Sequence, residues 1–317
     1  MASKKPADKA KPAPTGELQS PKGMRDIMGA EYYKLQGFYE KAQEVAIYYG
    51  FDPIKTPHLE DSRVFEKGLG AGTDALEKEM YSLKTKGGDV LALRPEGTAA
   101  VMRAYLEHGM RNLPQPVSLY YSGSLFRHDK PQRGRYREFQ TFGLEVIGTE
   151  KAIADALIIQ TFVKILEEAG CPSVVVDINS LGDKDSRVAY HKALVAYYRK
   201  HINALPAIDR ERLKTNPLRI LDSKEVKTIA INEEAPDSIS FLTPSAKKHF
   251  KEVLEYLDEA GIVYRINKNL VRGLDYYSHT VFEVIEQNDD PETSGLALGG
   301  GGRYDGLAKM LGSKKEI

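Results

Sequence analysis

The stretch VSLYYSGSLFRHDKPQRGRYREFQTFGLEVI, residues 117–147, carries the clearest structural signal in the sequence. Its two ends, 117–126 and 136–147, are rich in β-branched and aromatic side chains, whereas the middle holds Pro131 and Gly134. β-Branched and aromatic residues favour strands, and proline and glycine favour turns. The stretch therefore predicts an antiparallel hairpin with a long loop.

Apolar residues recur at helical spacing on both sides of this hairpin. Residues 31–49 carry them at steps of three and four, and Gly50 follows as a typical helix end. Strands interrupted by helices and joined by a hairpin indicate an α+β fold, in which an antiparallel β-sheet is flanked by helices. Further helices are predicted over 150–169 and from Thr243-Pro244, and short strands at 90–93, 173–178, 262–266, 280–285 and 296–298.

The charge of the chain is balanced. Its 317 residues include 45 Lys and Arg against 45 Asp and Glu, so the formal net charge is zero. That balance excludes a protein that coats nucleic acid by its bulk charge, although basic residues can still be concentrated locally. Cys171 is the single cysteine, which excludes a disulfide scaffold. The seven histidines show no spacing with cysteine or glutamate that is typical of a zinc site.

The length predicts about two structural units, at roughly 150 residues per domain. Residues 1–20 are rich in Lys, Pro and Ala and are predicted to be a disordered tail, because they hold too little apolar surface to fold. Residues 181–236 have helical, charged segments, so we expect a helical insertion between two parts of one core, 21–180 and 237–317. The pattern of a secretory signal or a membrane span is not apparent, and a cytoplasmic protein is expected.

Five basic residues crowd the predicted hairpin loop, namely Arg127, Lys130, Arg133, Arg135 and Arg137. A guanidinium binds phosphate oxygens bidentately and cannot lose its proton. An aromatic ring such as Phe139 can stack on a base. The loop therefore predicts a site that holds the phosphate and base of one nucleotide between Arg127 and Phe139. The alternative is a solvated basic turn.

A second segment, Arg94-Pro95-Glu96-Gly97-Thr98, joins a predicted strand to a predicted helix. Thr98 can cap that helix, since a threonine hydroxyl accepts hydrogen bonds from the free backbone N–H groups of a helix start. Glu96 has two interpretations. It can face a cleft and pair with a substrate ammonium, or it can simply be an acid that is favoured by the dipole of the helix start.

Two more segments lie near the C-terminal end of the sequence. In Leu270–Tyr277, the adjacent Tyr276 and Tyr277 are expected to point to opposite faces of a strand, so that at most one lines a pocket. The alternative is a turn with an aromatic core. The glycines at 299–302 permit a close approach of the backbone to a ligand, or they form a flexible connector. They do not form a phosphate loop, because the Gly-Lys-Ser/Thr ending is missing.

Together and in this order, the four segments resemble those of the class II histidyl-tRNA synthetases, and the similarity runs from Pro21 to the last residue. Its most specific parts are LRPEGT at 93–98, the arginine-rich loop, LVRGLDYY at 270–277 and GGRYDGL at 301–307. The resemblance implies an enzyme that joins histidine and ATP into histidyl-adenylate, releases pyrophosphate and passes histidine to the 3′ end of its tRNA. It also implies Mg²⁺ that accompanies ATP, and a homodimer formed through the first class motif at 31–59.

The resemblance also gives roles to individual residues. It implies that Arg127 and Arg272 are catalytic. No metal site made of protein side chains is predicted. The histidine-binding residues that the resemblance implies are Glu96, Gly97, Thr98, Arg127, Thr141, Glu145, Arg272, Tyr276, Tyr277 and Tyr304. The implied ATP-binding residues are Arg127, Asp129, Arg135 and Phe139, and those for the acceptor end of the tRNA are Lys130, Gln132 and Arg133.

Several positions depart from the family pattern. The family usually has Glu where this chain has Asp129, Arg where it has Lys130, and Gln where it has Thr141. Because Thr141 is too short to hold the substrate amine in the same way, either a neighbour compensates or histidine affinity is reduced. The sequence stops before the third class motif, so a truncated catalytic region with impaired activity is expected. The alternatives are a histidine-binding regulatory subunit of ATP phosphoribosyltransferase and an inactive dimerising fragment.

Overall fold

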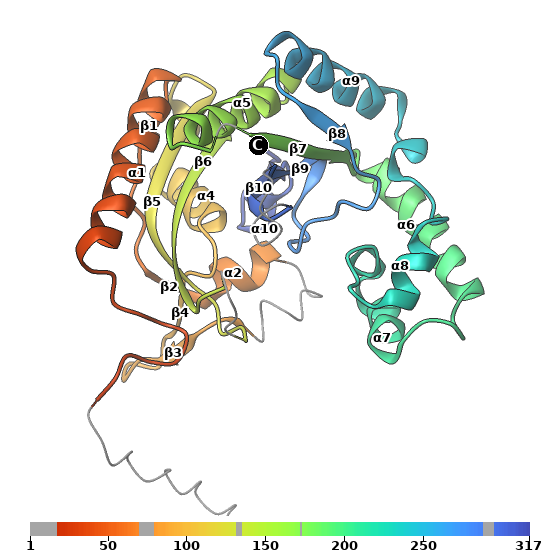
Figure 1. Cartoon of the computed structure of the whole chain (residues 1–317), viewed down its shortest axis with the longest axis horizontal. Coiled ribbons are helices and arrows are strands. Elements are labelled where there is room, and N and C mark those ends of the chain that lie inside the picture. Colours follow the sequence, from red (N-terminus) through yellow and green to blue (C-terminus); the bar gives the residue numbers. More distant parts are fainter. Residues whose placement is uncertain (1–17, 70–78, 131–134, 172, 288–294) are drawn as a thin grey trace, which may run out of the picture.

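The computed structural model describes residues 18–69, 79–130, 135–171, 173–287 and 295–317. The predicted disordered tail lies outside these ranges except for its last three residues. Helices cover two curved sheets, which face each other across the middle of the molecule (Figure 1). Within the described ranges, no helix is long and apolar enough to cross a lipid bilayer.

The predicted hairpin is confirmed as β5 (Val117–Phe126) and β6 (Glu138–Ile147), which pair antiparallel over their whole length. The short β1 (Asp52–Pro53) pairs with β5 in parallel. The helix α1 (Gly29–Tyr48) crosses this sheet, and its Ala42 and Val45 pack against Phe142, Leu144 and Ile165. Burial of this apolar stripe explains why the helical periodicity at 31–49 is so regular.

The second sheet has the order β10-β9-β7-β8. Its strands are β7 (Val174–Ser180), β8 (Tyr264–Ile266), β9 (Ser278–Glu286) and β10 (Ala297–Arg303). All pairs are antiparallel except β7 with β8, so the α+β class holds. The helices α5 (Ala152–Glu168) and α9 (Pro244–Glu259) bury an apolar face against this sheet, and the Thr243 side chain caps α9 as its sequence suggests.

The glycine run at 299–302 is part of β10 and is no flexible connector. A Cβ at Gly300 would lie 2.4 Å from the Phe282 carbonyl oxygen and 3.0 Å from the Arg272 guanidinium. A Cβ at Gly302 would lie 2.5 Å from the Thr280 carbonyl oxygen. The glycines therefore serve close packing against β9 and leave room for Arg272.

A third, small sheet of β2 (Leu59–Asp61), β4 (Val90–Leu93) and β3 (Ser82–Lys84) lies at one end of the hairpin. The helices α2 (Ser62–Leu69), α4 (Thr98–Glu107) and α10 (Leu307–Met310) and the short helix η1 (Met110–Asn112) accompany it. Their core includes Phe65, Met102 and Tyr105, all fully buried. This core fixes the start of α4, where the candidate site lies.

The region after β7 is helical and projects to one side of the molecule (Figure 1). It holds α6 (Lys184–Lys200), α7 (Ala207–Thr215), η2 (Pro217–Ile220), α8 (Val226–Asn232) and η3 (Ser238–Phe241). These elements share an apolar core of their own, which includes Tyr190, Leu194, Tyr198 and Ile220. We call residues 181–236, which hold the first four of these elements, the helical module.

One buried ion pair ties β10 to α5. Arg303, whose side chain is only 7% exposed, donates to Asp155 at 2.7 and 3.0 Å, and to the carbonyl oxygens of Thr149 and Lys151. Asp155 also accepts from Thr280, at 2.6 Å. Although burial raises the pKa of Asp155, a hydrogen bond from a neighbouring histidine and the charge of Arg303 hold it below its usual value.

Removal of the Asp155 carboxylate should destabilise the protein strongly. We expect Asp155→Ala to lower the free energy of unfolding by about 2–4 kcal/mol, because the buried Arg303 guanidinium then loses its buried anion and keeps the partly exposed Asp305, at 3.0 Å. The exposed Glu167 pairs with Lys164 on the surface, and Glu167→Ala should cost no more than about 0.5 kcal/mol. Urea unfolding of both variants measures the difference. Equal losses would contradict a stabilising role for the buried pair.

Candidate functional site

Two buried carboxylates form the centre of the candidate site. Glu96 accepts from the backbone N–H groups of Thr98 at 2.7 Å and Ala99 at 2.9 Å, at the start of α4. The Thr98 hydroxyl donates to Glu145 of β6 at 2.8 Å. The prediction that Thr98 caps the helix is therefore wrong. Glu96 caps it, which leaves the Thr98 hydroxyl free to bridge to the second carboxylate.

Tyrosines surround this carboxylate pair. Tyr304, directly after β10, donates to Glu145 at 2.5 Å, and the Tyr276 hydroxyl lies 3.5 Å from Glu96. Tyr276 and Tyr277 are both buried, and their ring centroids lie 4.7 Å apart. The expectation that they point to opposite faces of a strand is wrong, because they lie in a turn that precedes β9.

Tyr121 completes the cluster and was missed in the sequence. A Cβ at Gly97 or at Gly143 would lie 2.2 Å from its ring, so both glycines are required for it to fit. Gly143 is its cross-strand partner in the hairpin. A tyrosine opposite a glycine was the available signal, because glycine lets a neighbouring aromatic ring lie flat over the strand.

Burial changes the ionisation of both carboxyls. It raises the pKa of Glu145 to about 7, although hydrogen bonds from Tyr304 and Thr98 oppose the shift. Burial also raises the pKa of Glu96, against the two backbone N–H groups and the charge of Arg127. Near neutral pH the pair therefore carries less than two full negative charges. Such a cluster suits a ligand that brings N–H donors and a positive charge.

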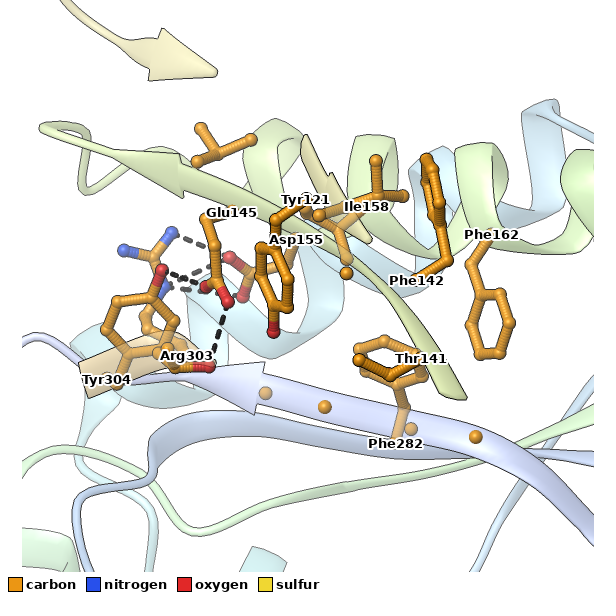
Figure 2. A pocket seen from close by; sticks show the side chains of 18 of the residues that line it. Tyr121, Thr141, Phe142, Glu145, Asp155, Ile158, Phe162, Phe282, Arg303 and Tyr304 are labelled. Carbon is orange, nitrogen blue, oxygen red and sulfur yellow. Dashed lines mark hydrogen bonds and ion pairs between the residues drawn. The ribbon is translucent and has the colours of Figure 1, made fainter. Parts of the chain in front are cut away.

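A cavity of about 380 Å³ opens beside the cluster, between β6 and β10. Its polar end holds Glu145 and Tyr304, and Arg303 and Asp155 lie beside them (Figure 2). Its other end is apolar and lined by Phe142, Phe162 and Phe282, with Thr141 nearby (Figure 2). Within the described residues, β6 pairs only with β5 and β10 only with β9. The strands β6 and β10 are thus edge strands, and the cavity lies beside the edge that has no neighbouring strand.

A second cavity, of about 750 Å³, is lined by cations. We call it the arginine cavity; it holds Arg25, Arg127, Arg135, Arg219 and Arg272, with Phe139, Glu79 and Asp129. The Arg127 guanidinium lies over the Phe139 ring, 5.4 Å from its centroid, and donates to the Pro95 carbonyl at 2.9 Å. Arg135 lies 3.7 Å from Asp129, and Arg272 pairs with Glu283. The combination of guanidinium groups and a flat ring can bind a nucleoside polyphosphate.

The residues implied for histidine and for ATP fall into these two neighbouring places. The carboxylate cluster gathers Glu96, Gly97, Thr98, Glu145, Tyr276, Tyr277 and Tyr304, and the arginine cavity gathers Arg127, Asp129, Arg135, Phe139 and Arg272. Their individual roles remain predictions. Lys130 is exposed, and Gln132 and Arg133 lie outside the described residues. In the described part of the chain, no three Cys, His, Asp or Glu side chains gather as a metal site.

Known proteins with a similar sequence agree on one family. The family model described as "Histidyl-tRNA synthetase" matches residues 23–316. A histidine–tRNA ligase of Desulforamulus reducens is 41% identical over 292 residues, which cover 92% of this chain and 69% of that protein. One from Synechococcus elongatus is 42% identical over 295 residues, 93% of this chain and 67% of that protein.

Solved structures agree with the sequence matches. The apo histidyl-tRNA synthetase of S. aureus superposes with a TM-score of 0.76 and 35% identity, covering 95% of this chain and 70% of that one. A Bacillus halodurans protein described as an ATP phosphoribosyltransferase regulatory subunit/histidyl-tRNA synthetase gives 0.69 and 24% identity, covering 94% and 79%. At that lower identity, the likeness extends to the fold alone.

The raised pKa of Glu145 predicts a specific pH dependence. Between its unfolded value, about 4.3, and about 7, the folded protein holds a proton that the unfolded chain has lost. The free energy of unfolding should therefore fall as the pH rises through this window, by about 1–3 kcal/mol. The Glu145→Gln variant has no carboxyl proton to lose, so its free energy of unfolding should lack this pH-dependent contribution. Urea unfolding at pH 5 and pH 8 measures this contribution, and Glu66→Gln, at an exposed glutamate, is the control. The same pH dependence in the unmodified chain and in both variants would contradict a raised pKa for Glu145.

Proposed function

The chain belongs to the histidyl-tRNA synthetase family, and from this membership we propose that it activates histidine with ATP and transfers it to the 3′ end of histidine tRNA. It is thus a class II aminoacyl-tRNA synthetase. One observation carries the proposal. A buried carboxylate cluster suited to a cationic amino acid adjoins an arginine cavity suited to ATP, and Arg127 lies between the two.

We propose that the carboxylate cluster recognises histidine. Glu145, with Tyr304 and Tyr277 beside it, would accept from an N–H of the imidazole ring. Glu96 and the Thr98 hydroxyl would hold the ammonium group. Thr141 lines the same cavity and would contribute less to amine binding than a longer amide side chain. These contacts fix the orientation of the amino acid so that its carboxylate points toward Arg127.

The reaction itself needs no covalent intermediate on the enzyme. A carboxylate oxygen of histidine attacks the α-phosphorus of ATP. The bond from that phosphorus to the oxygen that bridges to the β-phosphate breaks, and pyrophosphate leaves with the electron pair. Arg127 and Arg272 would stabilise the negative charge that develops, and the two cavities would align the reactants. The motifs show no activated nucleophile, in keeping with a reaction that forms no covalent bond to the enzyme.

Adenine is proposed to stack on Phe139, with Arg127 over the same ring and Asp129 and Arg135 beside it. Magnesium would arrive with ATP. The phosphates would hold the ion, and Glu79 and Asp129, which line the arginine cavity, are the carboxylates that could add ligands. Its chemistry there is to neutralise phosphate charge.

The partners of the site follow from the same proposal. Lys130, which is exposed and follows Asp129 of the arginine cavity in the chain, would contact the acceptor end of the tRNA, and the helical module would contact the acceptor stem. We propose a homodimer through α1, whose outer face exposes Tyr32, Tyr33, Ile47 and Tyr48. A cytoplasmic location fits an enzyme of translation.

The regulatory subunit of ATP phosphoribosyltransferase is a weaker candidate. The comparable protein of Bacillus halodurans supports a shared fold only. A subunit that only binds histidine has no need for the arginine cavity, whereas adenylate formation requires it. The cavity therefore favours the synthetase.

Exchange of labelled pyrophosphate into ATP tests the proposed function. The chain should catalyse exchange when histidine is present and not with other amino acids. Arg127→Ala should lower kcat/KM by about 100-fold or more, since it removes charge stabilisation in the transition state. Arg63→Ala, which breaks an exposed ion pair with Asp61, should leave exchange unchanged. No exchange at saturating histidine would overturn the proposed function.

Charge reversal at Lys130 separates the two steps of the reaction. Lys130→Glu should slow transfer of histidine to tRNA severalfold by repelling the phosphates of the acceptor end, with little effect on pyrophosphate exchange. Lys86→Glu reverses a charge that is also exposed, in the β3–β4 turn, and should affect neither step. A contact with tRNA at Lys130 would be excluded by equal losses in exchange and charging.

A further inference from the structure

One residue of the arginine cavity comes from outside the catalytic core. Arg219 lies on η2 in the helical module, yet it lines the same cavity as Arg127, Arg135 and Arg272. None of the four sequence segments that resemble the family includes it. Its side chain is half-buried, so it does not project freely into solvent.

The backbone around Arg219 is held firmly. Its neighbours Pro217 and Ile220 are buried, and Ile220 packs in the apolar core of the helical module. The Arg219 N–H donates to the Asn216 carbonyl at 3.1 Å. The Asn216 side chain in turn donates to Asp275 at 2.7 Å. Arg219 is thus presented to the cavity from a fixed turn.

The helical module is also joined to the segment that carries Arg272. Val271 packs against the core of the module. Asp275 accepts from Asn216 through its side chain and from Arg187 through its carbonyl, at 2.7 and 3.2 Å. Arg219 and Arg272 therefore reach the arginine cavity from one connected unit.

Arg219 differs from the other arginines of the cavity in its contacts with the described residues. Arg25 pairs with Glu31, Arg135 with Asp129 and Arg272 with Glu283. Within the ranges that the structure describes, Arg219 takes part in no ion pair, and its guanidinium donates no hydrogen bond. Its charge acts to lower the pKa of Glu79, which lines the same cavity, and of Asp275.

A guanidinium that lines an arginine-rich cavity without a carboxylate partner suits a phosphate oxygen. We propose that Arg219 is a binding residue for the β- or γ-phosphate of ATP, and hence for the pyrophosphate product. The inference rests on the proposed function, because it takes ATP as the occupant of the arginine cavity. It makes the helical module part of the ATP site as well as a tRNA contact.

Binding of inorganic tripolyphosphate tests this role directly, without the need for exchange activity. Isothermal titration with the unmodified chain should detect binding, and Arg219→Ala should weaken it about 10-fold. Arg219→Lys keeps the charge but loses the bidentate contact, and should weaken binding less. Arg210→Ala removes an exposed charge from the same module and should bind as the unmodified chain does. Wild-type affinity in Arg219→Ala, or no binding by the unmodified chain, would overturn the inference.

Steady-state kinetics of pyrophosphate exchange and of tRNA charging together separate the two sources of phosphate. If Arg219 binds ATP, Arg219→Ala should raise the KM for ATP about 10-fold and leave the KM for histidine unchanged. If its partner were instead the phosphate backbone of tRNA, the KM for tRNA would rise and that for ATP would not, which would contradict the inference. Exchange by the unmodified chain together with wild-type ATP kinetics in Arg219→Ala would remove the inference and leave the proposed function intact.

Discussion

The structure of the site depends on the burial of two carboxyl groups, Glu96 and Glu145, next to each other. Such burial is costly unless hydrogen bonds compensate for lost water. Glu96 is compensated by the free N–H groups at the start of α4, and Glu145 by the hydroxyls of Thr98 and Tyr304. Residues 96–99, Glu145 and Tyr304 are far apart in the sequence and must therefore pack against one another. Much of the fold positions these three segments.

Close packing and a buried ion pair hold these three segments together. Gly97 and Gly143 admit the ring of Tyr121 between α4 and the hairpin, and the buried pair of Arg303 and Asp155 fixes the end of β10, from which Tyr304 reaches Glu145. The chain is neutral overall, yet five arginines line one cavity. Local concentration of charge, not net charge, thus defines where a polyphosphate can bind.

Sequence patterns predicted the helices and strands that are determined by their own residues. The hairpin follows from its strand-forming residues and α1 from its apolar spacing, and both were located to within two residues. The failures concern side chains whose surroundings come from elsewhere in the chain. Thr98 looked like a cap, but Glu96 competes for the same N–H groups, and the adjacent Tyr276 and Tyr277 lie in a turn. No local pattern could place Arg219, because only the docking of the helical module brings it to the cavity.

The central claim is that the carboxylate cluster and the arginine cavity are two halves of one site, which holds histidine and ATP in line for reaction. A stable sulfamoyl analogue of histidyl-adenylate spans both halves, so its affinity, measured by isothermal titration, tests the claim most directly. Because one molecule would make both sets of contacts, we predict binding at least about 1000-fold tighter than that of histidine alone. Affinity no greater than that of histidine would contradict the account.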